Sequence, residues 1–241
     1  MNLELHYFPR STATQKVRLC QHHKGLTFAA EHVVDLIQLQ QLDPAYLAIN
    51  PRGQVPALTV DGRTLAESSI INEFLEESFP ERPLLPRDPR LRAEIRMWTK
   101  YVDTGPTVQI ASPTFAAWVV PGLAGHPDRD GLLALVSRAP DPVTRARWQR
   151  TVRAEISEEE VATAWQAITT LLARMNDRLS AGPWLFGADY SLADVETTPL
   201  IVRVTHLGRA DLLDPHPRVA AWLERVQARA NFAPTYAFLQ A

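Results

Sequence analysis

The sequence predicts an α/β part with a mixed sheet, followed by an all-α helical bundle. Three observations lead to this prediction. Residues 1–80 alternate strand-like and helix-like patterns, prolines crowd residues 81–91, and residues 92–241 carry mainly helical periodicity. The chain has 241 residues and is 46% hydrophobic, which favours two domains with sizeable cores. We therefore expect domains at 1–80 and 92–241, joined by a linker at 81–91.

Residue patterns in the first part predict the order strand, helix, strand, hairpin, helix. Leu3, Leu5 and Tyr7 recur with the period of two that is typical of a strand. The helical spacing that begins at Gln15 stops at Gly25, a residue suited to the end of a helix. The expected strands are 3–8, 28–35, 55–60 and 63–66, and the expected helices are 15–24 and 68–79, with a loop or a helix at 36–54.

Helix-start signals organise the second part. Ser157 with Glu160 and Ser191 with Asp194 have the spacing of capping boxes, and Pro217 suits a first helical position. Residues 113–156 are poorly periodic and rich in proline, so we expect an irregular insertion or a broken helix there. Three tryptophans are expected to pack in the interior: Trp98, Trp148 and Trp165.

Composition excludes several classes of function. Lys+Arg 25 against Asp+Glu 27 gives a net charge of −2 with no basic run, so we expect no nucleic-acid partner. The longest apolar run, 115–120, is too short to span a membrane, and the N-terminus lacks a secretory pattern, which predicts a cytoplasmic protein. The one cysteine, Cys20, predicts a small buried residue and no disulfide. His22 and His23 have no partners at metal spacing, so we expect a surface position and no metal.

Two short segments are suited to binding a peptide-like ligand. Pro56 at a strand start removes a donor and bends the chain, so we expect a cis Val55–Pro56 bond and free backbone groups on Val55 for strand addition. Glu67 and Ser68 stand where a helix begins, and Ser68 is the expected cap. Free N–H groups there attract a carboxylate, while Glu67 can accept from an ammonium group. Together these clamps suit a small γ-glutamyl peptide.

These segments carry a family resemblance. Val55-Pro56, Glu67-Ser68 and the capping-box motif Gly187–Asp194, in this order and at these separations, resemble the cytosolic glutathione transferases over almost the whole chain. The resemblance implies a thioredoxin-like N-terminal domain, glutathione as co-substrate, no metal, a small-molecule electrophile and a homodimer. It also implies that the enzyme acts through the glutathione thiolate.

The resemblance places the thiol-activating hydroxyl in the loop after the first strand. Ser11 is the first choice and Thr12 the second, with Thr14 also present; Tyr7 is the alternative from the tyrosine-type classes. These hydroxyls can instead be plain loop or cap residues. Further glutathione contacts are expected from Gln40, Gln41 and Gln54, although Gln40 and Gln41 lack the charge that relatives use for the glycyl carboxylate.

A closer resemblance concerns the type of transferase. The segments 49–58 and 92–103 and the insertion at 140–150 resemble the bacterial β-aryl-etherases, glutathione transferases that cleave lignin-derived aryl ethers. One alternative is a glutathione-dependent isomerase, because the loop around Ser11 also resembles the maleylacetoacetate isomerases, which usually have a cysteine where Ala13 stands. Another is a non-catalytic module that uses the fold to bind a ligand or a partner.

Overall fold

The N-terminal part of the chain folds around a four-stranded mixed sheet. A computed structural model describes residues 1–124 and 126–239; residues 125, 240 and 241, which fall in the expected insertion and helical domain, lie outside the described residues. The strand order is β2 (Ala30–Val33), β1 (Leu3–Tyr7), β3 (Ala57–Val60) and β4 (Arg63–Ala66). β1 runs parallel to β2 and antiparallel to β3, which confirms the predicted mixed sheet.

Strand ends differ from the prediction for local reasons. β2 is shorter than the predicted 28–35 because its partner β1 ends at Tyr7, which pairs with Val33. β3 begins at Ala57 rather than at Val55 because Pro56 has no N–H to give to the ladder. β4 has the predicted bounds, and it is joined to β3 by the predicted hairpin turn, with positive φ at both Asp61 and Gly62.

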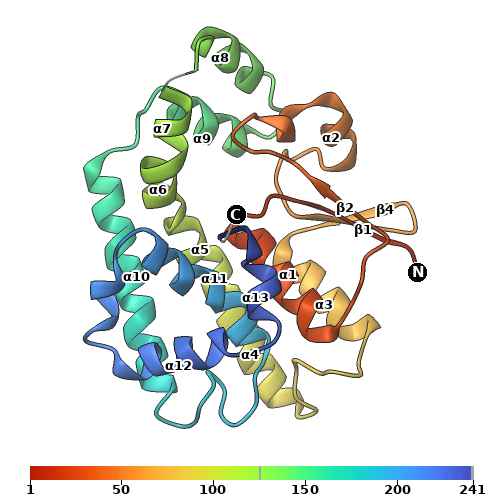
Figure 1. The fold of residues 1–241 in the computed structure, drawn as a ribbon, viewed down its shortest axis with the longest axis vertical. Coiled ribbons are helices and arrows are strands. Elements are labelled where there is room, and N and C mark those ends of the chain that lie inside the picture. The colour runs from red at the N-terminus through yellow and green to blue at the C-terminus, as the bar shows by residue number, and fades with distance from the viewer. Residues whose placement is uncertain (125, 240–241) are drawn as a thin grey trace.

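Two helices cover the face of the sheet that looks toward the rest of the molecule. α1 (Thr12–Lys24) and α3 (Ser68–Ser78) pack against one another there, and α2 (Pro44–Ile49) lies apart from them, beyond β2 (Figure 1). α1 begins three residues before the predicted Gln15, because the Ser11 hydroxyl accepts a hydrogen bond from the backbone N–H of Thr14 at 3.3 Å and so caps the helix.

The C-terminal part is helical. Both predicted capping boxes are confirmed, one at Ser157 with Glu160 and one at Ser191 with Asp194. α4 starts at Pro89, inside the expected linker at 81–91, because Asp88 caps it and proline suits a first helical position. The predicted insertion consists of short helices (Figure 1). A π-helical turn at Phe115–Val119 interrupts them. The helices of this part are α4 (Pro89–Thr104), α5 (Pro106–Gln109), α6 (Ala111–Thr114), the π-helical η2 (Phe115–Val119), α7 (Val120–Ala124), α8 (Arg129–Ser137), α9 (Pro142–Val152), α10 (Glu158–Arg178), α11 (Leu192–His206), α12 (Pro217–Gln227) and α13 (Phe232–Thr235). Short 3₁₀ turns are η3 (Ala210–Leu213) and η4 (Ala237–Leu239) here, and η1 (Gln40–Leu42) in the N-terminal part.

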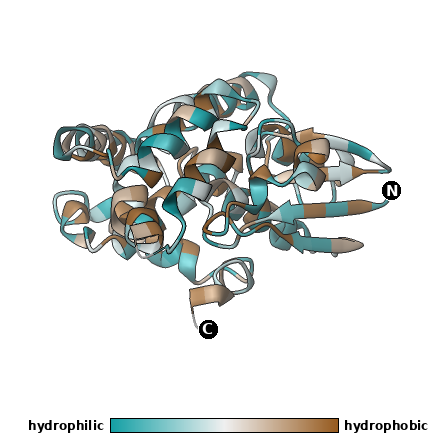
Figure 2. Cartoon of the chain, turned by 90° about the horizontal axis from the view of Figure 1, so that it is seen from above, coloured by the Kyte–Doolittle hydropathy of each residue, from teal (hydrophilic) through white to brown (hydrophobic). Residues whose placement is uncertain are grey.

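One apolar core runs through both parts. It joins Leu5 and Leu58 of the sheet to Ile168 and Trp222 of the helical part, and α1 is packed on α11 at the junction. Apolar and polar residues alternate along the elements, so that brown and teal bands succeed one another in Figure 2. A second cluster lies where the chain at and just before η1 packs against helices α7 to α9, and it includes Leu39, Leu42, Leu123, Val136, Trp148 and Val152.

Two expectations about single residues have different outcomes. Cys20 is fully buried, as predicted, and burial raises the pKa of its thiol. The expected surface position of His22 and His23 is wrong, since both side chains are partly buried. The His23 ring packs against Tyr190 at 5.6 Å between ring centres, and burial lowers the pKa of His23 to about 4. No helix within the described ranges is both long and apolar enough to cross a membrane.

Candidate functional site

A cavity of about 980 Å³ lies between the α/β part and the helical part. One wall is formed by the start of α1, the segment before β3 and the start of α3; the other comes from α4 to α6, the π-helical turn, α9 and α11. This volume is within the range of small-molecule sites. The cavity brings together seven of the predicted site residues: Ser11, Thr12, Gln54, Val55, Pro56, Glu67 and Ser68.

Ser11 combines two features at the start of α1. Its oxygen accepts from the Thr14 N–H, so its own O–H remains available to a ligand. Thr12, the first residue of α1, also borders the cavity. The first-turn N–H groups of a helix carry partial positive charge, which favours an anion next to Ser11 and Thr12.

The other two hydroxyl candidates are placed elsewhere. Thr14 is fully buried, and its hydroxyl oxygen accepts from the Phe8 N–H at 3.4 Å. Tyr7 packs against the main core, with the Arg18 guanidinium 5.1 Å from its ring centre. Neither Thr14 nor Tyr7 is among the residues that line the cavity.

The segment before β3 has an open backbone. The Val55–Pro56 bond is cis, as predicted. The Gln54 carbonyl is held by the Tyr46 hydroxyl and by the Asn50 amide, the latter at 2.8 Å. Within the described ranges, neither backbone group of Val55 has a hydrogen-bond partner, so both can pair with an extended ligand.

The start of α3 gathers polar groups of both charges. Ser68 is buried and is the first helical residue, which corrects its predicted role as cap; Glu67 occupies the capping position with φ +70°. This left-handed conformation costs a residue other than glycine about 1–3 kcal/mol, a strain that is typical of functional sites. The Glu67 carboxylate accepts from Arg52, and the Ser69 hydroxyl donates to Asp103 at 2.8 Å. Backbone N–H groups and two carboxylates therefore stand close together, an arrangement that suits the zwitterionic end of an amino acid.

A buried ion network supports this end of the cavity. The Lys16 ammonium lies 2.9 Å from an Asp103 oxygen and 3.1 Å from a Glu196 oxygen, and the Asn72 amide donates to Glu196 at 2.7 Å. Burial opposes the charge on Lys16, but the two carboxylates outweigh burial and hold the pKa of Lys16 above its usual value. Sequence reasoning missed this network, because no local pattern links residues so far apart in the chain.

The structure does not bring Gln40 and Gln41 to the cavity. Gln40 lies in η1, where its amide oxygen accepts from the Asp35 N–H at 2.8 Å. Gln41 is fully buried beside it. Leu36 and Ile37, from the segment before η1, border the cavity instead.

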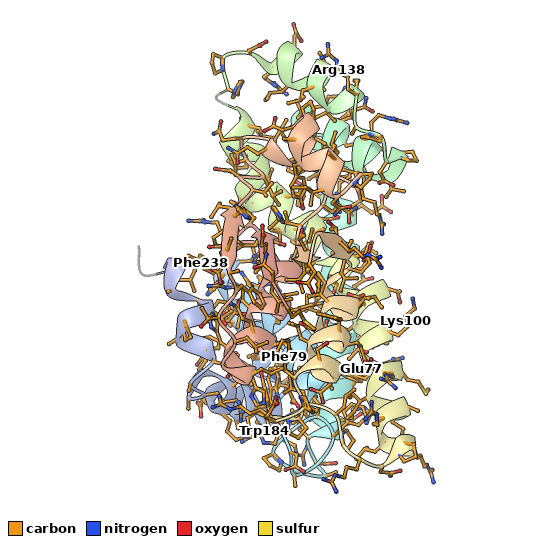
Figure 3. The ribbon with its side chains drawn as sticks, turned by 90° about the vertical axis from the view of Figure 1, so that its right-hand side faces the viewer. Glu77, Phe79, Lys100, Arg138, Trp184 and Phe238 are labelled. Atoms are coloured by element: carbon orange, nitrogen blue, oxygen red, sulfur yellow. The ribbon has the colours of Figure 1, made fainter. Side chains whose placement is uncertain are left out.

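Aromatic side chains of the helical part also line the cavity. Trp98 and Trp148 are buried, as predicted, and Trp165 is partly buried. Trp148 also borders the cavity, where its ring lies 5.3 Å from that of Phe115. On α4, Lys100 stands at the edge of this site, on the outer surface that Figure 3 shows. In the part of the chain that the structure describes, no three His, Cys, Asp or Glu side chains gather as a metal site would require.

Comparison of the sequence and the structure with known proteins identifies relatives of this chain. Residues 10–78 match the family model "Glutathione S-transferase, N-terminal domain" and residues 152–225 match "Glutathione S-transferase, C-terminal domain". Protein LigF from a Sphingobium species is 31% identical over 95% of this chain and 91% of its own length. The crystal structure of β-etherase LigF has a TM-score of 0.89 and 30% identity, with 100% of both chains covered. Maleylacetoacetate isomerase from Pseudomonas aeruginosa is 31% identical over 95% of this chain and 93% of its own length.

Proposed function

Because the chain belongs to the glutathione S-transferase family, as its sequence resemblance predicts, we propose that glutathione binds in the cavity as an extended tripeptide. Its cysteinyl backbone pairs with Val55, its γ-glutamyl end meets Glu67 and Ser68, and its thiol points to Ser11. The observation that carries this proposal is the convergence of all four residues on one cavity.

Ser11 is the proposed activating group. A free thiol has a pKa of about 8.5, and lowering it by about 2 units takes about 2.7 kcal/mol of preferential stabilisation of the thiolate. One hydrogen bond to a charged group supplies about 1.5–3 kcal/mol, and the start of α1 adds a favourable dipole. The Ser11 hydroxyl therefore accounts for most of the shift, with Thr12 as the second candidate.

The proposed reaction is a displacement. The thiolate sulfur forms a bond to an electrophilic carbon, and the leaving group departs with the electron pair of the broken bond. In a β-aryl ether the broken bond joins the β-carbon to the phenolic oxygen, and a phenolate departs. The similarity to LigF over the whole chain and the aromatic wall at Phe115 and Trp148 support an aryl substrate.

An isomerase is the second candidate, because the maleylacetoacetate isomerase relative is equally identical in sequence. The loop argues for a transferase, since Ala13 stands where isomerases usually have a cysteine. We also propose that the protein is cytoplasmic and forms a homodimer, as is typical of the family. Light scattering of the purified protein tests the dimer. Ile70 and Met97, on α3 and α4, present exposed apolar side chains for such an interface.

Product analysis distinguishes these functions. The protein is incubated with glutathione and an aryl ether ketone whose leaving group is guaiacol, and separately with maleylacetone. We expect equal amounts of guaiacol and glutathione thioether, a rate reduced by Ser11→Ala, and no change in the control Ser180→Ala, which alters an exposed serine far along the chain. Isomerised maleylacetone without thioether would establish the isomerase instead. Glutathione binding without either product would indicate a non-catalytic module.

A further inference from the structure

More cationic than acidic side chains line the cavity. Each acidic side chain that lines it has a cationic partner: Glu67 has Arg52, Glu73 has Arg96, and both Asp103 and Glu196 have Lys16. Four cationic side chains that line it form no ion pair with any described residue. They are Arg10, Lys100, Arg147 and Arg203. The side chains that line the cavity therefore carry more positive than negative charge.

Arg203 differs from the other three because it is buried. Only 3% of it is exposed, whereas Arg10 and Lys100 are exposed at the cavity edge. Its guanidinium donates to the Thr114 hydroxyl at 3.1 Å and to the Arg10 carbonyl, and it lies 4.5 Å from the ring centre of Trp118. All these partners are neutral groups, and the guanidinium Nε has none.

The ionisable groups that act on Arg203 do not supply a negative charge. Burial lowers the pKa of Arg203 to about 10, and the ionisable groups near it are Tyr236, Arg10 and His206. Burial and the charge of Arg203 lower the pKa of His206, so this ring adds no negative charge. The Tyr236 phenol is neutral, because burial raises its pKa well above the usual value. A buried cation without an anionic partner is costly, and proteins retain such groups mainly at functional sites.

The position of Arg203 identifies which ligand can supply the anion. The Arg10 carbonyl directly precedes Ser11, and Thr114 directly precedes Phe115 of the aromatic wall, so the guanidinium lies between the thiol end and that wall. The two carboxylates of glutathione are at the ends of the tripeptide, away from its thiol. An anionic group beside Arg203 therefore has to come from the second substrate.

Arg147 adds a second cation on the same wall. Its guanidinium lies 5.7 Å from the ring centre of Phe115, and the acidic group that acts on it is Asp141, which does not line the cavity. The side chain is exposed, and desolvation by the surrounding protein lowers the pKa of Arg147, with Arg52 adding to this shift and Asp141 opposing it. Arg147 and Arg203 thus approach neighbouring residues of one helical turn, Phe115 and Thr114.

We propose that the electrophile is an aromatic compound that carries a carboxylate, and that Arg203 binds this carboxylate. The proposal rests on the proposed function, and it narrows the substrate class. A guanidinium presents paired N–H donors that match the two oxygens of a carboxylate. Phe115 and Trp148 contact the aromatic ring, and Arg147 provides a second, weaker attraction.

The test compares two electrophiles that differ in one charge. They are 4-chloro-3,5-dinitrobenzoate and the corresponding uncharged carboxamide, from both of which the glutathione thiolate displaces chloride. We expect the wild-type kcat/KM to favour the carboxylate at least about ten-fold. In Arg203→Gln this ratio should fall to about one, chiefly through the KM of the carboxylate. Arg203→Lys should keep part of the preference, and the exposed control Arg218→Gln all of it.

Binding measurements separate this proposal from the proposed function. Calorimetry with glutathione present compares 3,5-dinitrobenzoate with 3,5-dinitrobenzamide, neither of which has a leaving chloride. Preferential binding of the carboxylate without any turnover would leave the carboxylate site standing and overturn the transferase. Equal treatment of the two compounds by the wild type, or an equal loss for both in Arg203→Gln, would overturn the carboxylate site. Should Arg203→Gln fail to fold, Arg203→Lys and Arg147→Gln decide, and an unchanged preference in both refutes the proposal.

Discussion

Replacing Ser11 by alanine should raise the pKa of bound glutathione. The Ser11 hydroxyl has its oxygen occupied by the Thr14 N–H and its hydrogen free, so alanine removes a donor to the thiolate. A hydrogen bond to a charged group contributes about 1.5–3 kcal/mol, and one pKa unit corresponds to 1.36 kcal/mol. We therefore expect the thiol pKa to rise by about 1–2 units. The lost cap of α1 should also lower the stability of the protein by about 1 kcal/mol.

Ultraviolet absorbance of the thiolate, followed against pH, measures this shift directly. The wild type is compared with Ser11→Ala, with Ser11→Thr, which keeps both the hydroxyl and the cap, and with Thr12→Val. Turnover of Ser11→Ala should fall at neutral pH and recover at high pH, where the thiol ionises without help. A shift in Thr12→Val alone would assign the role to Thr12. Unchanged midpoints in both Ser11→Ala and Thr12→Val would refute both hydroxyls as donors to the thiolate and leave the dipole of α1 as the activating element.

Three further results are expected. Glu67→Gln should weaken glutathione binding about ten- to hundred-fold in calorimetry by removing a charged acceptor, and unchanged affinity would exclude this contact. Lys16 outweighs burial and holds the pKa of the Asp103 carboxyl below its usual value. The ionised carboxylate therefore stabilises the fold at neutral pH, and this stabilisation is lost in acid as the pH falls through the pKa of the folded state. Asp103→Asn should lower the melting temperature at neutral pH, with a difference from wild type that shrinks in acid; a constant difference would contradict the pairing. Asp194→Ala should cost about 3 kcal/mol or more in denaturant unfolding, because it leaves the Trp222 indole N–H and two backbone N–H groups without an acceptor, and a loss below about 1 kcal/mol would show that water replaces it.

The elements that the sequence predicts best are those with local signals. The hairpin around Asp61 and the helix started by Ser157 follow from turn and cap chemistry that acts within a few residues. Errors occur where a neighbouring strand decides the end, as at Val33, or where one side chain extends a helix into an apparent loop, as Ser11 does. Helix and strand propensities alone do not predict either effect.

The residues of the candidate site could likewise be predicted only where their sequence signal is local. Ser11, Val55 and Glu67 stand in short segments whose chemistry is visible in sequence, and the structure brings them to one cavity. Gln40 has suitable chemistry, but the turn that carries it directs its amide to the Asp35 backbone. Arg203 has no local signal at all, because its surroundings come from segments about ninety and two hundred residues away in the chain.

The buried Lys16 network has a consequence for recombining this protein with its relatives. Lys16 comes from the first helix, whereas its partners Asp103 and Glu196 come from α4 and α11. A chimaera could join residues 1–80 of this chain to the second half of a homologue that lacks those acids. It would bury the Lys16 ammonium without a counter-ion where the two parts meet. The proline-rich segment at 81–91 is a convenient place to join the two halves. A chimaera joined there is expected to be stable only when Lys16, Asp103 and Glu196 are all present.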